Sequence, residues 1–353
     1  MNLKLQWLRN KIASLDLQGI IISNPINIKY LTGLDAEGIL LVTRKENIYI
    51  TDGRYIEYVH STLTLFDEII VYDQKDVSTD DYENFFMFCE NVGFEEHYVT
   101  YAKYKELVRK YKINNLVETD YIIEKQRMIK DEEEIKNIQK ACEITDKCFD
   151  YLLTFIKEGM TEKQVALEIE MFFKKNGAEG NSFDPIVAVG ENSSIPHWRP
   201  GDRKIKNADP ILIDMGCKVN GYCSDMTRTI FMGCILEEIK PIYNLVLKNQ
   251  KNVIEEMRNN CSIKNLGRGV EDSFKFNNYT LIHGLGHGVG LDIHEIPSIH
   301  SKNESFLKEN MVVTDEPGIY IPGKYGIRIE DTILINKNDC TPLTKSKKEY
   351  VVI

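Results

Sequence analysis

The sequence has no apolar run that approaches the roughly 20 residues needed to cross a bilayer, so we expect no membrane-spanning helix. None of its eight cysteines forms a C-x-x-C pair, and they are scattered through apolar segments. This spacing argues against a disulfide framework and favours reduced, mostly buried thiols in a cytoplasmic protein. Charged residues interrupt the apolar ones from Met1 to Arg9, which predicts an amphipathic helix rather than a signal peptide.

The sequence also has fewer positively charged residues than negatively charged ones, with 44 Lys and Arg against 54 Asp and Glu. The formal net charge of −10 argues against a nucleic-acid partner or an anionic membrane partner. We find no internal repeat of short period and no low-complexity tract. A hydrophobic content of 42% and a charged content of 28% are typical of an ordinary globular protein. Because 353 residues exceed the size at which one core usually stops growing, we expect two domains.

The first part of the chain has the pattern of an α/β unit. Helical spacing relates Leu5, Leu8, Ile12 and Leu15. Four later segments have the composition of strands, namely Gly19–Ser23, Gly38–Thr43, Asn47–Thr51 and Glu68–Tyr72. Such alternation favours a mostly parallel or mixed sheet covered by helices. This part contains no cluster of catalytic residue types, and we place the two domains at residues 1–125 and 126–353.

Two helix starts mark the beginning of the second part. Asp131–Glu134 places acidic side chains in a first helical turn, where they complement the helix dipole. Thr161–Gln164 is a capping-box pattern, and Gly177 is a stop signal for the helix that begins there.

The pair Asn220-Gly221 is the strongest short-range hairpin signal in the chain. If these two residues form the turn, Asp214 opposes Thr227, and Asp225 lies on the same face as Asp214, diagonal to it. The strand Ile211–Ile213 is apolar on both faces, which indicates burial, so Asp214 needs a partner for its charge. Two carboxylates placed in this way could flank a pair of metal ions.

Histidines cluster farther along the chain. His283 and His287 lie in a segment with four glycines, which disfavours a helix and lets the backbone approach a ligand closely. His294 follows shortly after. Because these histidines are clustered, we interpret them as candidates for a catalytic or ligand-binding role. His300 lies in a polar stretch and is interpreted as incidental.

Two further acidic residues stand at strand positions. Glu316 follows a short apolar strand and precedes a Pro-Gly turn, and Asp315 should point to the opposite face. Strict alternation over Gly326–Ile333 predicts one strand with Arg328 and Glu330 on the same face. Arg328 could form a plain ion pair with Glu330, or it could orient that residue as a metal ligand.

These segments together supply four carboxylates and one neutral imidazole. The candidate ligands are Asp214, Asp225, His287, Glu316 and Glu330. Two divalent cations would neutralise the four negative charges. Oxygen donors with one nitrogen suit Mn²⁺, Co²⁺ or Zn²⁺, with Mn²⁺ our first choice. If the five side chains converge, they form a two-metal hydrolytic centre.

The motifs resemble those of the pita-bread metallopeptidases, the family of methionine aminopeptidase, aminopeptidase P and prolidase. The resemblance rests on Ile213–Gly216 with Gly221–Thr229, on His283–Pro297, on Glu316–Tyr320 and on Arg328–Asp331. Asn27–Gly33 and Thr51–Tyr55 are similar to a creatinase-type N-terminal domain. The resemblance implies an α/β (α+β) chain with a creatinase-like N-terminal domain and a pita-bread catalytic domain.

The N-terminal domain and Ile195-Pro196-His197 point to the proline-specific branch of that family. The chain departs from the branch at Trp198-Arg199-Pro200, at the edge of the substrate pocket. The implied activity is hydrolysis of the bond before proline by a hydroxide that bridges the two metals.

The resemblance also implies roles for individual residues. Asp225, His287 and Glu316 would hold one metal ion. Asp214 would hold the other, and Asp225, Glu316 and Glu330 would be shared. Glu316 would also move the proton. His283 and His294 would stabilise the oxyanion or protonate the leaving nitrogen. His197 and Arg328 would position the substrate.

Several alternatives stay open. The enzyme could be an Xaa-Pro aminopeptidase acting on the N-terminus of peptides, or a prolidase acting on Xaa-Pro dipeptides. The family implies a homodimer. The competing hypothesis is a non-catalytic pita-bread binding module, which would have no need for an intact set of five ligands.

Overall fold

The computed structural model describes residues 2–63, 69–75, 85–86 and 89–353. The chain divides into two compact units, Met1–Arg127 and Met128–Ile353. All eight cysteines are unpaired, as expected, and four of them are buried. Within the described part of the chain, no helix combines the length and the apolar character required to cross a membrane.

The first unit is built on a six-stranded sheet in the order β4-β3-β2-β1-β5-β6. Its strands are β1 (Gly19–Ile22), β2 (Ile39–Thr43), β3 (Asn47–Thr51), β4 (Ile69–Asp73), β5 (Asn91–Phe94) and β6 (Asn115–Glu118). β2 runs antiparallel to β1 and β3, whereas the other three pairs are parallel. The mixed sheet was expected. Glu68, the first residue of the fourth predicted strand, lies outside the described residues.

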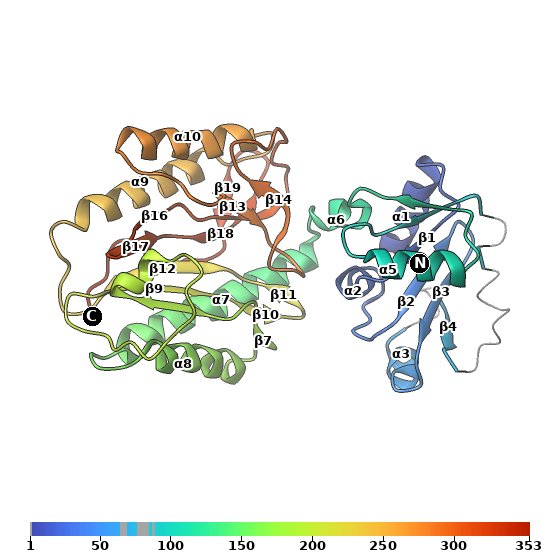
Figure 1. Ribbon diagram of the computed structural model, residues 1–353, viewed down its shortest axis with the longest axis horizontal. Coiled ribbons are helices and arrows are strands. Elements are labelled where there is room, and N and C mark those ends of the chain that lie inside the picture. Colours follow the sequence, from blue (N-terminus) through green and yellow to red (C-terminus); the bar gives the residue numbers. More distant parts are fainter. Residues whose placement is uncertain (1, 64–68, 76–84, 87–88) are drawn as a thin grey trace. The chain divides into compact units, whose positions relative to one another are not determined.

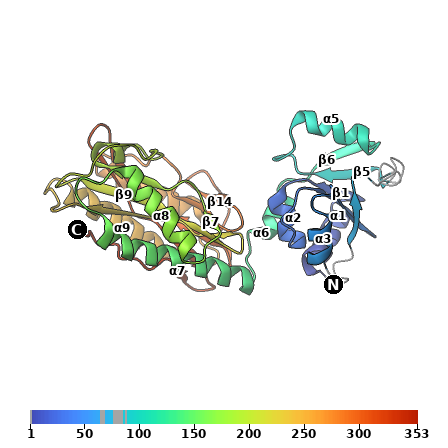
Figure 2. The same ribbon diagram turned by 90° about the horizontal axis from the view of Figure 1, so that it is seen from below.

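Helices cover both faces of this sheet. They are α1 (Leu3–Ser14), α2 (Pro25–Thr32), α3 (Ile56–Thr62), α5 (Tyr101–Lys110) and α6 (Ile122–Arg127). Figure 2 shows α5 on one face and α1 and α2 on the other. The first predicted helix buries Leu5, Leu8 and Ile12, but it ends at Ser14, so Leu15 is exposed.

The second unit packs two pairs of helices around its strands. The helices are α7 (Glu132–Phe155), α8 (Glu162–Lys175), α9 (Lys240–Glu256) and α10 (Ile263–Phe276). Figure 1 shows α7 and α8 on one side of the strands and α9 and α10 on the other. One apolar core lies under α7 and α8, and a second lies under α9 and α10. The polar site described below lies among the strands that these two cores support.

The strands of the second unit form small antiparallel sheets. The first half contributes β7 (Gly180–Asn181), β8 (Ile186–Val189), β9 (Pro210–Met215), β10 (Cys217–Val219), β11 (Tyr222–Cys223) and β12 (Met226–Phe231). The second half contributes β13 (Gly286–Gly288), β14 (Glu295–Ile299), β15 (Val312–Asp315), β16 (Gly318–Ile321), β17 (Tyr325–Arg328), β18 (Asp331–Ile335) and β19 (Cys340–Pro342). The largest sheet has the order β14-β13-β15-β18-β19, and β9 lies between β8 and β12.

Three predicted features of this unit are confirmed, namely a hairpin turn, its register and a helix cap. The hairpin turns at Asn220 and Gly221, whose φ angles of 50° and 82° are the positive values that this turn requires. Its register pairs Asp214 with Thr227, as expected. Thr161 caps α8 in a complete capping box with Gln164, and α7 begins with a second capping box, formed by Asp131 and Glu134.

One prediction for this unit was wrong. Gly326–Ile333 is not a single strand, because the chain leaves β17 after Arg328 and enters β18 at Asp331. β17 pairs with β16, whereas β18 pairs with β15 and β19, so the chain changes sheets at Ile329 and Glu330. Glu330 therefore stands in a break between strands, and its backbone N–H donates to the carbonyl of Thr227 at 3.1 Å.

Candidate active site

One cavity of about 610 Å³ in the second unit collects all the side chains that the sequence singled out for chemistry. Its walls include Asp214, Asp225, His287, Glu316, Glu330, His283, His294, His197 and Arg328. They come from β9, β13 and β17, from the ends of strands, and from the loops that follow them. Residues more than 100 positions apart in the chain therefore share one polar space.

The carboxylates and the imidazole approach one another closely. Asp225, His287 and Glu330 each offer an atom within 4.8 Å of the other two, which is compatible with one shared metal ion. The Nε2 atom of His287 lies 3.5 Å from a carboxylate oxygen of Asp225 and 3.6 Å from one of Glu316. Asp214 reaches the same cavity from β9 through the predicted hairpin register.

His287 is oriented with a free nitrogen facing these carboxylates. Its Nδ1 lies 3.0 Å from the carbonyl oxygen of Gly288, and a carbonyl can only accept, so Nδ1 carries the proton. Nε2 therefore keeps its lone pair. Burial lowers the pKa of His287 to about 4, which keeps the ring neutral at pH 7. A neutral imidazole held by a backbone carbonyl is the usual form of a histidine metal ligand.

Two carboxylate oxygens in the cavity lack a protein partner. Among the described residues, neither Oδ1 of Asp214 nor Oδ1 of Asp225 has a hydrogen-bond donor, although both atoms are buried. A buried charged oxygen without a donor is costly unless a cation binds it. These orphaned atoms, together with the neutral imidazole, fit the divalent metal ions expected from the sequence.

The carboxylates also oppose one another electrostatically. Burial, followed by the charges of the neighbouring carboxylates, raises the pKa values of Asp225 and Glu330 well above their ordinary range. Burial raises the pKa of Glu316 to about 7, and the charge of Asp214 adds to that shift. In the absence of a cation, this many buried carboxyl groups cannot all be ionised at once. Bound divalent cations would keep them ionised.

Arg328 forms hydrogen bonds that connect several of the site residues. Its Nη2 donates to Asp214 at 2.6 Å, and its Nε donates to the hydroxyl of Thr227 at 3.0 Å. That hydroxyl donates to Glu330 at 2.6 Å. The sequence left open an ion pair between Arg328 and Glu330, but in the structure the ion pair is with Asp214, and Thr227 connects Arg328 to Glu330.

The sequence reasoning assigned no role to Tyr320, although it lies in the motif that contains Glu316. Its hydroxyl accepts from Nη1 of Arg328 at 2.8 Å and lies 2.9 Å from Nε2 of His283. Nδ1 of His283 donates to the carbonyl of Gly284, so Nε2 is the acceptor of the tyrosine proton. Burial lowers the pKa of His283 to about 4. The ring of His294 lies 4.5 Å from that of His287.

A buried acid on α8 holds the loop that carries His197, and the sequence reasoning missed this role as well. Glu162 is completely buried. One of its oxygens accepts from Val189 N and the Asn192 amide, and the other accepts from Gly201 N and the indole N–H of Trp198, all at 2.8–2.9 Å. The only sequence signal was the capping-box segment that includes it. The unusual Trp198 is thus a structural part of the pocket edge.

Comparisons with known proteins identify the families of both parts of the chain. The model of metallopeptidase family M24 matches residues 136–337, and that of the Creatinase/Prolidase N-terminal domain matches residues 4–129. A curated Xaa-Pro dipeptidase of Pyrococcus horikoshii is 36% identical and covers 99% of this chain and 99% of its own length. An uncharacterized peptidase of Bacillus subtilis is 35% identical over 99% of this chain and all of its own length.

Solved structures give the same assignment. The Xaa-Pro dipeptidase from Bacillus anthracis superimposes with a TM-score of 0.93 at 32% identity and covers 99% of both chains. The X-Pro aminopeptidase from Thermotoga maritima has a TM-score of 0.88 at 30% identity and covers 97% of this chain and all of its own. The expected fold is confirmed, and the chain belongs to metallopeptidase family M24, with the N-terminal domain of the creatinases and prolidases.

Proposed function

We propose that this chain is a metal-dependent peptidase that hydrolyses the bond between an N-terminal residue and a following proline. The observation that carries the proposal is the convergence of four acidic side chains and a neutral histidine in one cavity, within a chain of this peptidase family. The named relatives support the substrate class, because they are dipeptidases or aminopeptidases acting before proline. We propose residues 1–125 and 126–353 as the two functional domains.

Asp214, Asp225, His287, Glu316 and Glu330 are the proposed ligands of two divalent metal ions, with Mn²⁺ preferred over Co²⁺ and Zn²⁺. The unpartnered oxygens of Asp214 and Asp225 support this assignment. When bound, such ions supply a hydroxide nucleophile at neutral pH and polarise the scissile carbonyl. Homodimeric assembly and a cytoplasmic location remain predictions from the family and the composition.

The other side chains of the cavity bind, orient and move protons. Glu316, which lines the cavity beside His287, is the proposed proton carrier between water and the leaving nitrogen. His283 has its Nε2 occupied as an acceptor, so His294, exposed at the cavity wall, is the better placed histidine to donate to developing charge. Arg328 fixes Asp214 and Tyr320, while His197 presents an exposed imidazole to the substrate.

Proline makes a dedicated site necessary. An Xaa-Pro bond has no amide N–H, so an enzyme that recognises peptides by that donor loses a hydrogen bond there. The cavity instead offers Phe183, Pro185, Ile186 and Trp198 beside its polar wall, a surface against which a pyrrolidine ring can pack.

The proposal is tested by incubating the purified chain with Mn²⁺ and either an Xaa-Pro dipeptide or an Xaa-Pro-Yaa tripeptide. Release of the N-terminal residue from either substrate is expected, and the ratio of the two rates separates dipeptidase from aminopeptidase. Glu316→Ala should abolish turnover while the fold is retained. Absence of turnover on both substrates would refute the proposal. The relatives named above lend no support to a non-catalytic module.

A further inference from the structure

The break between β17 and β18 raises a physical question about Glu330. A metal ligand must be held within a few tenths of an ångström, yet the ladder hydrogen bonds of neither strand hold this residue. Its side chain is held by Thr227, as described above. Its backbone N–H donates to the carbonyl of Thr227, and its own carbonyl accepts from Nη1 of Arg228. Because Glu330 has no strand partner for its carbonyl, Arg228 supplies that hydrogen bond from its side chain.

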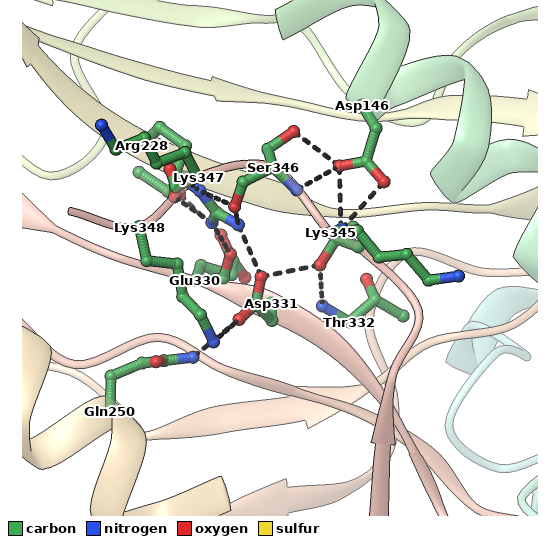
Figure 3. Close-up of polar contacts among 12 residues, drawn as sticks. Asp146, Arg228, Gln250, Glu330, Asp331, Thr332, Lys345, Ser346, Lys347 and Lys348 are labelled. Atoms are coloured by element: carbon green, nitrogen blue, oxygen red, sulfur yellow. Dashed lines mark hydrogen bonds and ion pairs between the residues drawn. The ribbon is translucent and has the colours of Figure 1, made fainter. Parts of the chain in front are cut away.

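Arg228 is a buried arginine with all of its donors engaged. Its exposed fraction is 1%. Nη1 donates to the carbonyls of Thr227 and Glu330, and Nη2 donates to Asp331 at 2.7 Å and to the carbonyl of Ser346 at 2.8 Å. Nε reaches the carbonyls of Ser346 and Lys347 at 3.3 and 3.1 Å. The planar fork therefore ties the Glu330 carbonyl and the Asp331 side chain to a segment near residue 346 (Figure 3).

That segment, Leu343–Lys348, is itself clamped from two directions. On the α7 side, the carboxylate of Asp146 accepts from Lys345 N, Ser346 N and the hydroxyl of Ser346, at distances from 2.6 to 3.0 Å. On the other side, Lys348 Nζ donates to Asp331 at 2.6 Å. Figure 3 shows Ser346 and Lys345 between these two acids, with Arg228 beside Lys347.

Asp331 completes the connection. It is fully buried and also accepts from Thr344 at 2.8 Å and from Gln250 of α9 at 2.9 Å. Helix α9, the segment Leu343–Lys348 and the strand β12 thus meet at the residue that directly follows Glu330, and α7 is joined to it through the segment. A buried network whose donors are paired in this way is rigid, so it resists displacement of the break.

We propose that Arg228 is a positioning residue that, braced by the segment Leu343–Lys348, sets the place of Glu330 in the metal centre. This role rests on the proposed metal-dependent function. Arg228 faces away from the donor atoms of the cavity and acts through the Glu330 carbonyl, so the expected effect is on metal affinity. Partners that orient metal ligands in this way typically change affinity by about 10–100-fold when they are altered.

Arg228→Lys is the sharpest variant. It keeps the positive charge beside Asp331, so the buried acid stays compensated, but an ammonium group cannot reproduce the fork that joins Glu330 to Ser346. We expect the metal-free variant to bind Mn²⁺ about 10–100-fold more weakly than the parent chain in titration calorimetry. Lys348→Met and Asp146→Asn loosen the segment and leave Arg228 intact, so each should weaken Mn²⁺ binding by a smaller factor than Arg228→Lys does.

A matched control is available at the residue that directly follows the segment. Glu349→Gln breaks the exposed ion pair with Lys251 at 3.0 Å and touches neither Asp331 nor Arg228, so its Mn²⁺ affinity should equal that of the parent. Thermal unfolding of the metal-free proteins is measured in parallel, because a merely structural role would lower the unfolding temperature and leave the affinity unchanged.

The outcomes separate the two proposals. If the parent chain binds no Mn²⁺, the proposed function fails and this role fails with it. If the parent binds Mn²⁺ and Arg228→Lys binds it equally well, the positioning role alone is overturned. If Arg228→Lys does not fold, the Asp146→Asn and Lys348→Met affinities decide, and parent-like values for both overturn the role.

Discussion

Glu162→Gln is a test of how the pocket edge is held. The carboxylate receives four N–H donors, two on each oxygen, and it is completely buried. Glutamine replaces one oxygen by an NH₂ group. Whichever way the amide turns, two donors of the loop then face another donor. Glutamine is nearly the same size, so the change removes hydrogen bonds without opening a cavity.

The magnitude follows from the lost contacts. Hydrogen bonds to a charged group contribute about 1.5–3 kcal/mol each, so losing two of them destabilises the docked loop by about 3–6 kcal/mol. Residues 189–201, which carry His197 and Trp198, should then be docked for only part of the time. Because apparent affinity falls with the fraction of competent protein, KM for an Xaa-Pro substrate should rise at least about tenfold, with a smaller change in kcat.

Two measurements check this expectation. Steady-state kinetics gives KM and kcat, and amide hydrogen exchange should be faster at Val189 and Gly201, whose N–H groups bind Glu162. Glu168→Gln is the control, because it is the same change on the same helix and keeps an acceptor for its partner Tyr151. An unchanged KM together with unchanged exchange in Glu162→Gln would refute the anchoring role.

Three further predictions concern other parts of the chain. Thr227→Val removes the 2.6 Å hydrogen bond to Glu330, which should lower kcat/KM about tenfold in steady-state assays, and a parent-like value would contradict the linkage. Gly286→Ala would place a Cβ 2.1 Å from the Thr314 carbonyl and should destabilise the protein by about 3 kcal/mol in urea unfolding, whereas a neutral effect would show that this strand can move. Burial raises the pKa of Glu95 from 4.5 to about 7, so its contribution to stability is complete below pH 4.5 and is lost as the pH rises through 7. Glu95→Gln should remove about 2.5 kcal/mol of that pH dependence between unfolding at pH 5 and at pH 8, and an unchanged difference would argue against it.

Features set by neighbouring residues could be predicted from the sequence. The hairpin is one such feature, because Asn220 and Gly221 tolerate positive φ angles, and a two-residue turn leaves only one register for Asp214 and Asp225. The capping box at Thr161 is another. In both cases the stabilising contact lies within a few positions of the residues that signal it, so no knowledge of the tertiary structure is required.

Features set by distant partners could not be derived in this way. The break at Glu330 arises because β17 and β18 pair with different strands. The alternation of apolar and polar residues continues unchanged through the break, so the sequence pattern does not reveal it. The pairing of Arg328 with Asp214 joins residues 114 positions apart. Glu162 was visible only as part of a cap, since its four partners are Val189 at the end of β8 and three residues of the segment that follows. The resemblance located the site residues, but their mutual contacts required the fold.

The charge balance of the cavity changes once Arg328 is included. From the sequence, two divalent cations would neutralise four carboxylates. In the structure the buried guanidinium already compensates one of them, Asp214, through an ion pair of 2.6 Å. Two divalent ions would then leave one positive charge in excess within a site of low polarity. Such an excess favours an anion, both the nucleophilic hydroxide and the negative charge that develops on the scissile carbonyl oxygen. The residue that orients Asp214 therefore also makes the proposed centre electrostatically complementary to the transition state rather than to the neutral peptide.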